Sequence, residues 1–247
     1  MNIPFTQSDL SSLGLHEEDL LGLLSRLDLW SQILRRQEEE AIVNIVELDS
    51  AFVEESRKTL LGDYSIDDYL SLHRLSASDF DINVRLSECL RLFSEQHFGP
   101  GIEEAFLSSQ GGHDQIIYSL IRVKDNGLAR ELWIRLEEGE DTFSELASTY
   151  GEGPEAAKRG VIGPTPIGSI HPPELASLLR SLQCGEIHPP RTLGEWVILI
   201  RLEQLTPARL DTSMRAHLLR QQLDAFLDAR VKLRLSGSSV DKLTYYS

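Results

Sequence analysis

The fold is decided by the stretch from Asp114 to Leu205, which opens with the apolar run Gln115-Ile-Ile-Tyr-Ser-Leu-Ile-Arg-Val123. A run of this length and composition favours a β-strand. Helical patterns follow at residues 127–139 and 141–150, then a Gly- and Pro-rich segment and another short helix. A second strand-like run closes the stretch, Trp196-Val-Ile-Leu-Ile-Arg-Leu202. This order of elements is the strongest clue to function in the chain.

The residues before this stretch have apolar side chains at helical spacing. Helix starts are predicted at Ser8-Asp-Leu-Ser11 and at His16-Glu-Glu-Asp19, where acidic groups suit the helix dipole. The stripe from Glu38 to Lys58 is predicted to kink or divide near Asp49 and Ser50. A further helix, capped by Ser78 or Asp79, is predicted to run to His97, before Gly99-Pro-Gly101 breaks it.

After the stretch, one long amphipathic helix is predicted from Leu210 to Leu235, followed by a frayed tail. A single helix cannot bury its own apolar stripe, so it is expected to pack back on the N-terminal helices. The predicted domains are therefore residues 1–112, an inserted domain at 113–206, and the returning helix with its tail at 207–247.

Composition and charge limit the functions that the chain can have. It has 247 residues, 41% of them hydrophobic, enough for one large or two small domains. The net charge of -15 opposes nucleic acids and anionic membranes, and no apolar run approaches the 18 residues of a membrane span. Cys89 and Cys184 form neither a disulfide framework nor a zinc site. The N-terminus lacks the basic start and apolar core of a signal peptide, so a cytoplasmic protein is expected.

An ordered set of motifs within residues 115–205 resembles a parvulin-type peptidyl-prolyl isomerase domain. Besides the two strand-like runs, the motifs are Glu138-Gly-Glu-Asp-Thr-Phe-Ser-Glu-Leu-Ala147, Arg159-Gly-Val-Ile-Gly163, Ile170-His-Pro-Pro-Glu-Leu175 and Cys184-Gly-Glu-Ile-His-Pro-Pro190. The flanks resemble those of the SurA and PrsA chaperones, in which a helical region and a C-terminal helix surround the parvulin domain. The resemblance implies an α+β fold, a four-stranded antiparallel sheet with surrounding helices inserted into an all-α chaperone-like body.

The resemblance also implies a reaction, the rotation of the peptide bond before proline. The barrier is roughly 18–20 kcal/mol for peptide bonds in general. Catalysis needs no cofactor or nucleophile. It needs an apolar pocket for the proline ring and polar groups that favour the twisted amide. His171 and His188 each precede Pro-Pro, but no third ligand has metal-site spacing, so no metal is expected.

The family's site residues carry over only in part. The histidine of the family's first strand falls on Ser119 or Leu120, and that of its last strand, after the aromatic Trp196, falls on Val197. The pocket methionine matches Ile170, and the pocket phenylalanine matches Leu175 or Leu179. Ser119 is thus the catalytic candidate, and the predicted substrate-binding residues are Leu120, Ile170, Leu175, Leu179, Trp196 and Val197.

Each of these assignments has a structural alternative. Ser119 could point to solvent or to a neighbour, the apolar residues could all be core, and Trp196 could be a packing residue. The prolines are predicted to lie in loops at one end of the domain, either stiffening a groove rim or serving as turn residues; they are Pro164, Pro166, Pro172, Pro173, Pro189 and Pro190.

Three functions fit the sequence. The first is a foldase or chaperone of the isomerase family that binds unfolded or proline-containing segments, with weak or lost catalysis. The second is a non-catalytic adaptor for one protein or peptide partner. The third is a structural subunit whose apolar helix face makes a homodimer. The side chains in the groove between the two strands distinguish an enzyme from the other functions. A hydroxyl or imidazole there favours an enzyme, whereas a groove filled by Leu120 and Val197 does not.

Overall fold

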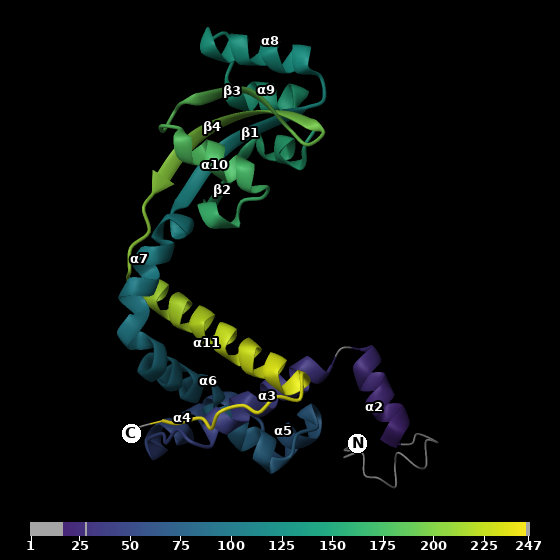
Figure 1. Ribbon diagram of the computed structural model, residues 1–247, viewed down its shortest axis with the longest axis vertical. Helices are drawn as coiled ribbons and strands as arrows, with labels where there is room; N and C mark the ends of the chain where they lie inside the picture. Colours follow the sequence, from purple (N-terminus) through teal and green to yellow (C-terminus); the bar gives the residue numbers. More distant parts are fainter. Residues whose placement is uncertain (1–16, 28, 246–247) are drawn as a thin grey trace. The chain divides into compact units, whose positions relative to one another are not determined.

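The computed structural model describes residues 17–27 and 29–245 (Figure 1). These residues form two compact units. One comprises the described residues up to Glu103 and from Thr212 onward, and the other comprises Glu104–Asp211. The helix start predicted at Ser8 lies outside the described residues. The domain limits expected at 112 and 206 stay a prediction about which segments fold independently.

The first unit is helical. Its elements are α2 (Glu17–Arg26), α3 (Trp30–Val43), α4 (Ser50–Leu61), α5 (Ile66–His73), α6 (Ala77–Phe98), the 3-10 turn η1 (Gly99–Gly101) and α11 (Thr212–Leu235). The predicted division near Asp49 is confirmed, because Asp49 caps α4 by accepting the backbone N–H of Ala51 at 2.7 Å. The cap predicted for α6 is wrong by two residues. Ser76 is the N-cap, and Asp79 completes a capping box with it.

The core of the helical unit lies between α3, α6 and α11. Fully buried residues of α3 and α6 meet apolar side chains of α11, and the cluster contains Ile42, Val43, Val46, Cys89, Phe93, Leu223 and Leu227. The tail was expected to fray, and that expectation is wrong. Leu243 and Tyr245 pack on this core, and Arg230 Nη1 donates to the carbonyl of Asp241 at 2.9 Å. A short polar tail shows no periodicity, so the pattern could not reveal these two anchors.

A buried ion pair joins α3 to α11 in this core. Glu38 has no exposed surface, and Arg230 Nε donates to its Oε2 at 2.5 Å. Arg234 Nε lies 2.6 Å from the other carboxylate oxygen, without the alignment of a hydrogen bond. The two halves of the helical unit are therefore joined by apolar packing and by charge.

The second unit is built on a four-stranded sheet with the order β2-β1-β4-β3, in which every neighbouring pair is antiparallel. The predicted α+β fold with a four-stranded antiparallel sheet is confirmed. Helix α7 (Ile102–His113) leads into it. The other elements are β1 (Gln115–Val123), α8 (Asn126–Glu137), α9 (Phe143–Tyr150), η2 (Pro154–Lys158), β2 (Val161–Pro166), η3 (Ile167–Ser169), α10 (Pro173–Ser181), β3 (Ile187–Leu193) and β4 (Trp196–Thr206).

The two central strands are buried on both faces, and their side chains alternate between two cores. Tyr118 and Leu120 of β1 face the side covered by α10. Ile121 and Val123 face the side covered by α8 and α9. Figure 1 shows α8 and α9 beyond one face of the sheet and α10 beyond the other. Strand parity therefore decides which β1 residues can take part in a site on the α10 side.

Four of the prolines expected in loops lie in strands instead. Pro164 and Pro166 belong to β2, and Pro189 and Pro190 belong to β3. Both are edge strands, where proline is tolerated because one side of the strand needs no ladder hydrogen bond. The register of β3 shifts between His188 and Arg191, across the Pro-Pro pair. The prediction of loops was wrong because proline usually indicates the end of a strand, and the sequence does not show that these strands lie at the edges of the sheet.

Candidate functional site

A cavity of about 410 Å³ lies on the α10 side of the sheet. Its walls come from β1, β2, the segment leading into α10, and the β3–β4 hairpin. The lining residues are Tyr118, Leu120, Arg122, Ile162, His171, Pro172, Glu174, Leu175, Leu193, Gly194, Trp196 and Ile198. The period of two along β1 and β4 explains why alternate residues of each strand reach it. The result is an apolar hollow with a few polar groups, the usual character of a small-ligand or peptide site.

Arg122 is the fixed charge of this cavity. Its Nε and Nη2 donate to the two carboxylate oxygens of Glu155 at 2.8 and 2.5 Å. Glu155 lies in η2 and is buried. Hydrogen bonding to Glu155 raises the pKa of Arg122 above its ordinary value, although burial acts against it. The bidentate pair holds the guanidinium in place at one end of the cavity.

Tyr118 contributes a hydroxyl to the same cavity. Burial raises the pKa of Tyr118 above its ordinary value, Glu155 raises it further, and Arg122 acts in the opposite direction. The phenol therefore stays protonated at neutral pH and can donate a hydrogen bond. His171, on the exposed segment before α10, adds an imidazole at the rim.

Trp196 closes the cavity at the hairpin end. It is half-buried and packs against the core on the α10 side. Lys124 Nζ lies 5.3 Å from the centroid of its ring, within cation–π range. The indole is therefore an ordered wall, with an apolar face on one side and a cation nearby.

No family model matches the chain. Over 121 residues it is 29% identical to the chaperone SurA of Vibrio cholerae, a stretch that is 47% of this chain and 28% of that protein. SurA of Vibrio vulnificus (strain YJ016) is 31% identical over the same length, with the same coverage.

The chain is similar to the SurA chaperones. This similarity confirms the predicted resemblance to the SurA chaperones. The chain spans only 28% of the length of the SurA relatives that it matches.

PrsA proteins are among the solved structures to which this chain is similar. A peptidylprolyl isomerase PrsA of Bacillus cereus is 18% identical, with a TM-score of 0.48, covering 98% of this chain and 93% of that one. The foldase protein PrsA of Streptococcus pneumoniae is 14% identical, also with a TM-score of 0.48, and 91% of each chain is covered.

The predicted site residues of this SurA-like chain fall into three groups. Leu120, Leu175 and Trp196 line the cavity. Ile170 and Leu179 belong to the core on the same side of the sheet but do not line the cavity, which agrees with their structural alternative. Ser119 and Val197 were placed wrongly.

Those two residues lie on the opposite face of the sheet, toward α8 and α9. Val197 is part of the core there. Ser119 is 2% exposed, and its hydroxyl donates to Glu203 Oε1 at 2.5 Å. Arg201 donates to the same oxygen at 2.8 Å. A one-residue difference in alignment moves a strand residue to the other face, so of the two first-strand alternatives only Leu120 faces the cavity.

Replacing Ser119 by alanine is expected to leave peptide binding and prolyl isomerisation unchanged. The substitution removes one hydrogen bond to the carboxylate of Glu203 on the far face, so the free energy of unfolding should fall by about 1.5–3 kcal/mol. Denaturant unfolding and NMR exchange on a proline peptide measure the two effects. A loss of peptide binding with unchanged stability would return Ser119 to the site.

The sequence reasoning missed most of the polar groups. Tyr118 and Arg122 are two residues before and after Leu120, and Ile198 is two residues after Trp196. Period-two counting from Leu120 and Trp196 would have found all three. His171 and Glu174 had no such signal, because their place in the cavity depends on how the segment before α10 folds back.

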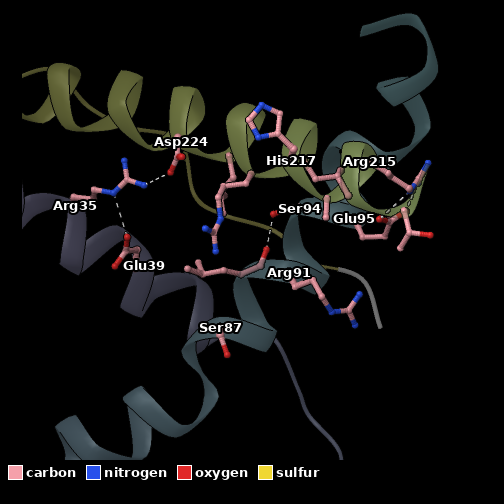
Figure 2. A pocket seen from close by; sticks show the side chains of 15 residues that line it. Arg35, Glu39, Ser87, Arg91, Ser94, Glu95, Arg215, His217 and Asp224 are labelled. Atoms are coloured by element: carbon pink, nitrogen blue, oxygen red, sulfur yellow. Dashed lines mark hydrogen bonds and ion pairs between the residues drawn. The ribbon is translucent and has the colours of Figure 1, made fainter. Parts of the chain in front are cut away.

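A second, larger cavity of about 800 Å³ lies within the helical unit, between α3, α6 and α11 (Figure 2). Leu90, Leu219 and Leu223 supply apolar lining, and the labelled arginines and carboxylates of Figure 2 supply charge. Arg215 pairs with Glu95 across α11 and α6. It is a mixed surface, without a polar group isolated among apolar walls.

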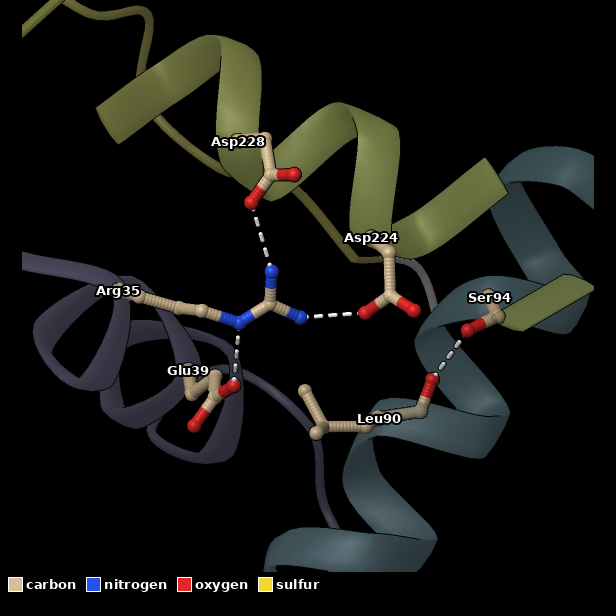
Figure 3. Close-up of polar contacts among 6 residues, drawn as sticks. All are labelled: Arg35, Glu39, Leu90, Ser94, Asp224 and Asp228. Carbon is tan, nitrogen blue, oxygen red and sulfur yellow. Dashed lines mark hydrogen bonds and ion pairs between the residues drawn. The ribbon is translucent and has the colours of Figure 1, made fainter. Parts of the chain in front are cut away.

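Arg35 of α3 organises the charges at one end of this second cavity (Figure 3). Its Nε donates to Glu39 Oε1 at 3.2 Å and its Nη1 to Asp228 Oδ1 at 2.8 Å. Its Nη2 also pairs with Asp224. Because three carboxylates already surround Arg35, it is poorly placed to recognise a further anion.

Within residues 17–27 and 29–245, no group of three or more His, Cys, Asp or Glu side chains could hold a metal ion. Among the same residues, no helix is both long enough and apolar enough to cross a bilayer.

Proposed function

We propose that the chain is a foldase or chaperone of the SurA type, whose cavity binds proline-containing segments of unfolded proteins and accelerates rotation of the bond before proline. The observation that carries the proposal is the pairing of apolar walls with a hydroxyl and an imidazole. Leu120, Leu175 and Trp196 offer a hydrophobic seat, while Tyr118 and His171 offer polar groups. This is the lining that favours an enzyme over a passive groove.

Rotation through this cavity would be slower than in a parvulin with both histidines. The two strand positions that match the family's histidines carry Leu120 and Val197, so neither position supplies an imidazole. The apolar seat can still exclude water from the twisted amide, which strengthens any hydrogen bond formed there.

The helical unit supplies a second surface for clients in this proposal. Its cavity has leucines beside paired charges, which suits extended segments of mixed composition. The net charge of -15 would favour basic or neutral clients over acidic ones.

Exchange spectroscopy on an Ala-Pro peptide tests the isomerase activity, and suppression of aggregation of a chemically unfolded protein tests the chaperone activity. The cis–trans exchange rate is expected to rise by about tenfold or more over the uncatalysed rate, a gain of 1.36 kcal/mol or more. Aggregation should slow at stoichiometric amounts. A chain inactive in both assays would rule the proposal out.

A non-catalytic adaptor is the second candidate. It is favoured by Leu120, which puts an apolar side chain at the matched position of a family histidine. Affinity capture followed by mass spectrometry separates the candidates. One stoichiometric partner, with no gain in exchange rate, would favour the adaptor, and many unfolded clients would exclude it.

A homodimer is a further proposal, from the exposed leucines Leu21, Leu23 and Leu27 in and just after α2. Light scattering that gives the mass of a monomer at high concentration would exclude it.

A further inference from the structure

The hydroxyl of Tyr118 is the least explained polar group of the cavity. The residue is 5% exposed, yet within the described part of the chain its phenol oxygen has no hydrogen-bond partner. Buried tyrosine hydroxyls usually find one. The oxygen is not among the sealed polar atoms, so it retains some accessible surface. The ring lines the cavity, and a ligand there can reach the hydroxyl.

The strand is irregular where Tyr118 lies. The register between β1 and β4 shifts between Ile117 and Tyr118, so that Glu203 of β4 has no residue opposite it on β1. The register between β1 and β2 shifts at the same place, between Ile116 and Tyr118. Bulges increase the local twist and re-aim a side chain, and they are frequent beside active sites. Tyr118 therefore lies where both ladders are irregular, and its side chain keeps the cavity face that it shares with Leu120.

Arg122 stands two positions beyond Leu120 on the same face. Two of its five N–H donors are used by Glu155, so Nη1 has no partner in the described residues. The pair is held in place, because Glu155 is buried. One wall of an apolar cavity therefore presents two fixed donors, an uncharged hydroxyl and a guanidinium edge.

The chemistry of amide rotation decides which donor can help. In the planar amide the nitrogen lone pair is delocalised toward oxygen, and twisting localises it on nitrogen. A donor to the carbonyl oxygen of the rotating bond stabilises the planar form and slows rotation. A donor to the proline nitrogen stabilises the twisted form. No covalent bond is made or broken, so a single well-placed hydrogen bond is a sufficient device.

We propose that Tyr118 is a catalytic residue of this cavity, whose hydroxyl donates a hydrogen bond to the proline nitrogen as the bond before it twists. The proposal rests on the proposed isomerase function. Tyr118 then supplies a polar group where the family's histidines are replaced. Leu120, its neighbour on the same face, and Trp196 provide the apolar seat for the proline ring.

Tyrosine is suited to this role in a buried position. A neutral hydroxyl costs less to bury without a partner than a charged group does. The guanidinium of Arg122 is a stronger donor, but it is already committed to Glu155 on one edge. The exposed imidazole of His171 must compete with water for its partner. The buried hydroxyl is thus the donor whose hydrogen bond forms only when substrate is present.

The experiment uses the full chain and the single substitution Tyr118→Phe, which keeps the ring and removes the hydroxyl. Exchange spectroscopy on an Ala-Pro peptide gives the rotation rate, and chemical-shift titration gives the dissociation constant. We expect the catalysed rate to fall by about tenfold, equivalent to 1.36 kcal/mol of transition-state stabilisation. The dissociation constant should change by less than about twofold, because planar substrate makes no bond to the hydroxyl.

Tyr150→Phe is the matched control. Tyr150 lies in α9, outside the cavity, and its hydroxyl accepts from Arg135 Nη1 at 3.4 Å. That variant should keep the wild-type rate. The midpoint of unfolding for Tyr118→Phe should not fall, since the lost hydroxyl has no partner, so a misfolded variant is recognised directly.

The outcomes separate the two proposals. A wild-type chain without catalysed exchange overturns the isomerase function and the role of Tyr118 with it. A wild-type chain with catalysed exchange and an equally active Tyr118→Phe variant overturns only the role of Tyr118. If Tyr118→Phe weakens binding and leaves the rate of the bound peptide unchanged, the hydroxyl is a ground-state contact and the proposal is also overturned.

Discussion

Replacing Glu38 by alanine is expected to lower the free energy of unfolding of the helical unit by about 3–5 kcal/mol. The carboxylate has no exposed surface and lies against Arg230 and Arg234. Arg230 is itself buried, so the substitution leaves a cation in a low-dielectric core without its partner. The loss comes mainly from that orphaned charge, and less from the attraction that is removed.

Glu40→Ala is the control for this prediction. Glu40 pairs with Arg36 one turn away on α3, and both side chains are about one-third exposed. An exposed pair of this kind contributes about 0.3–0.5 kcal/mol. Hydrogen exchange of the amides of α3, α6 and α11 measures the effect within the helical unit. A loss below about 1 kcal/mol for Glu38→Ala would show that water reaches the charges.

Adding Arg230→Met to Glu38→Ala is expected to restore part of the lost stability, because the second substitution removes the uncompensated charge. The double-mutant cycle would then show a large coupling energy between the two residues, which are far apart in sequence and in contact across α3 and α11. Additive effects would contradict the ion-pair explanation.

The second large effect is expected for Gly160→Ala in the sheet unit, which should lose about 2–5 kcal/mol of stability. Gly160 has φ +80, a conformation that L side chains rarely adopt. A Cβ there would lie 2.8 Å from Ala147 Cβ and 2.9 Å from the carbonyl oxygen of Leu120. Backbone strain and steric overlap therefore add together.

Gly160 also shapes the cavity wall, because its carbonyl accepts the N–H of Leu120 at 2.9 Å. A shift of Gly160 should move Leu120, so peptide affinity is expected to fall as well. Gly185→Ala is the matched control, since Gly185 has φ +86 and nothing within 4 Å of the added Cβ. That control should cost about 1–2 kcal/mol. Equal losses of stability in the two variants would show that the steric overlap at Gly160 has no effect.

The sheet could be predicted from its two central strands and not from its edges. β1 and β4 are long apolar runs buried on both faces, so composition alone identifies them. β2 reads Val-Ile-Gly-Pro-Thr-Pro and β3 reads Ile-His-Pro-Pro-Arg-Thr-Leu. Neither strand has a buried residue, and the prolines in both are typical of loops. They form strands because each lies beside a central strand, which supplies backbone hydrogen-bond partners along one side.

The sequence placed the candidate site on the correct strands but did not decide which residues of each strand face the cavity. Leu120 and Trp196 were found, whereas Ser119 and Val197 were assigned to a face that they do not occupy. Matching a family motif fixes a position to within one residue, and in a strand one residue reverses the face. Tyr118 was overlooked for a different reason. Counting by two from Leu120 reaches it, but only positions that match the family's site residues were taken as candidates.

The insertion of the sheet unit between α6 and α11 has a consequence for synthesis. Residues 104–211 are one continuous segment that forms a compact unit, so we expect this unit to fold before α11 is synthesised. The helical core cannot, because Leu223 and Leu227 belong to the last helix, as does the arginine that neutralises Glu38. Until α11 is made, the earlier helices expose an apolar seam and a carboxylate without its cation. A nascent chain halted before Thr212 is therefore expected to bind chaperones through its earlier helices, even once its sheet unit has folded.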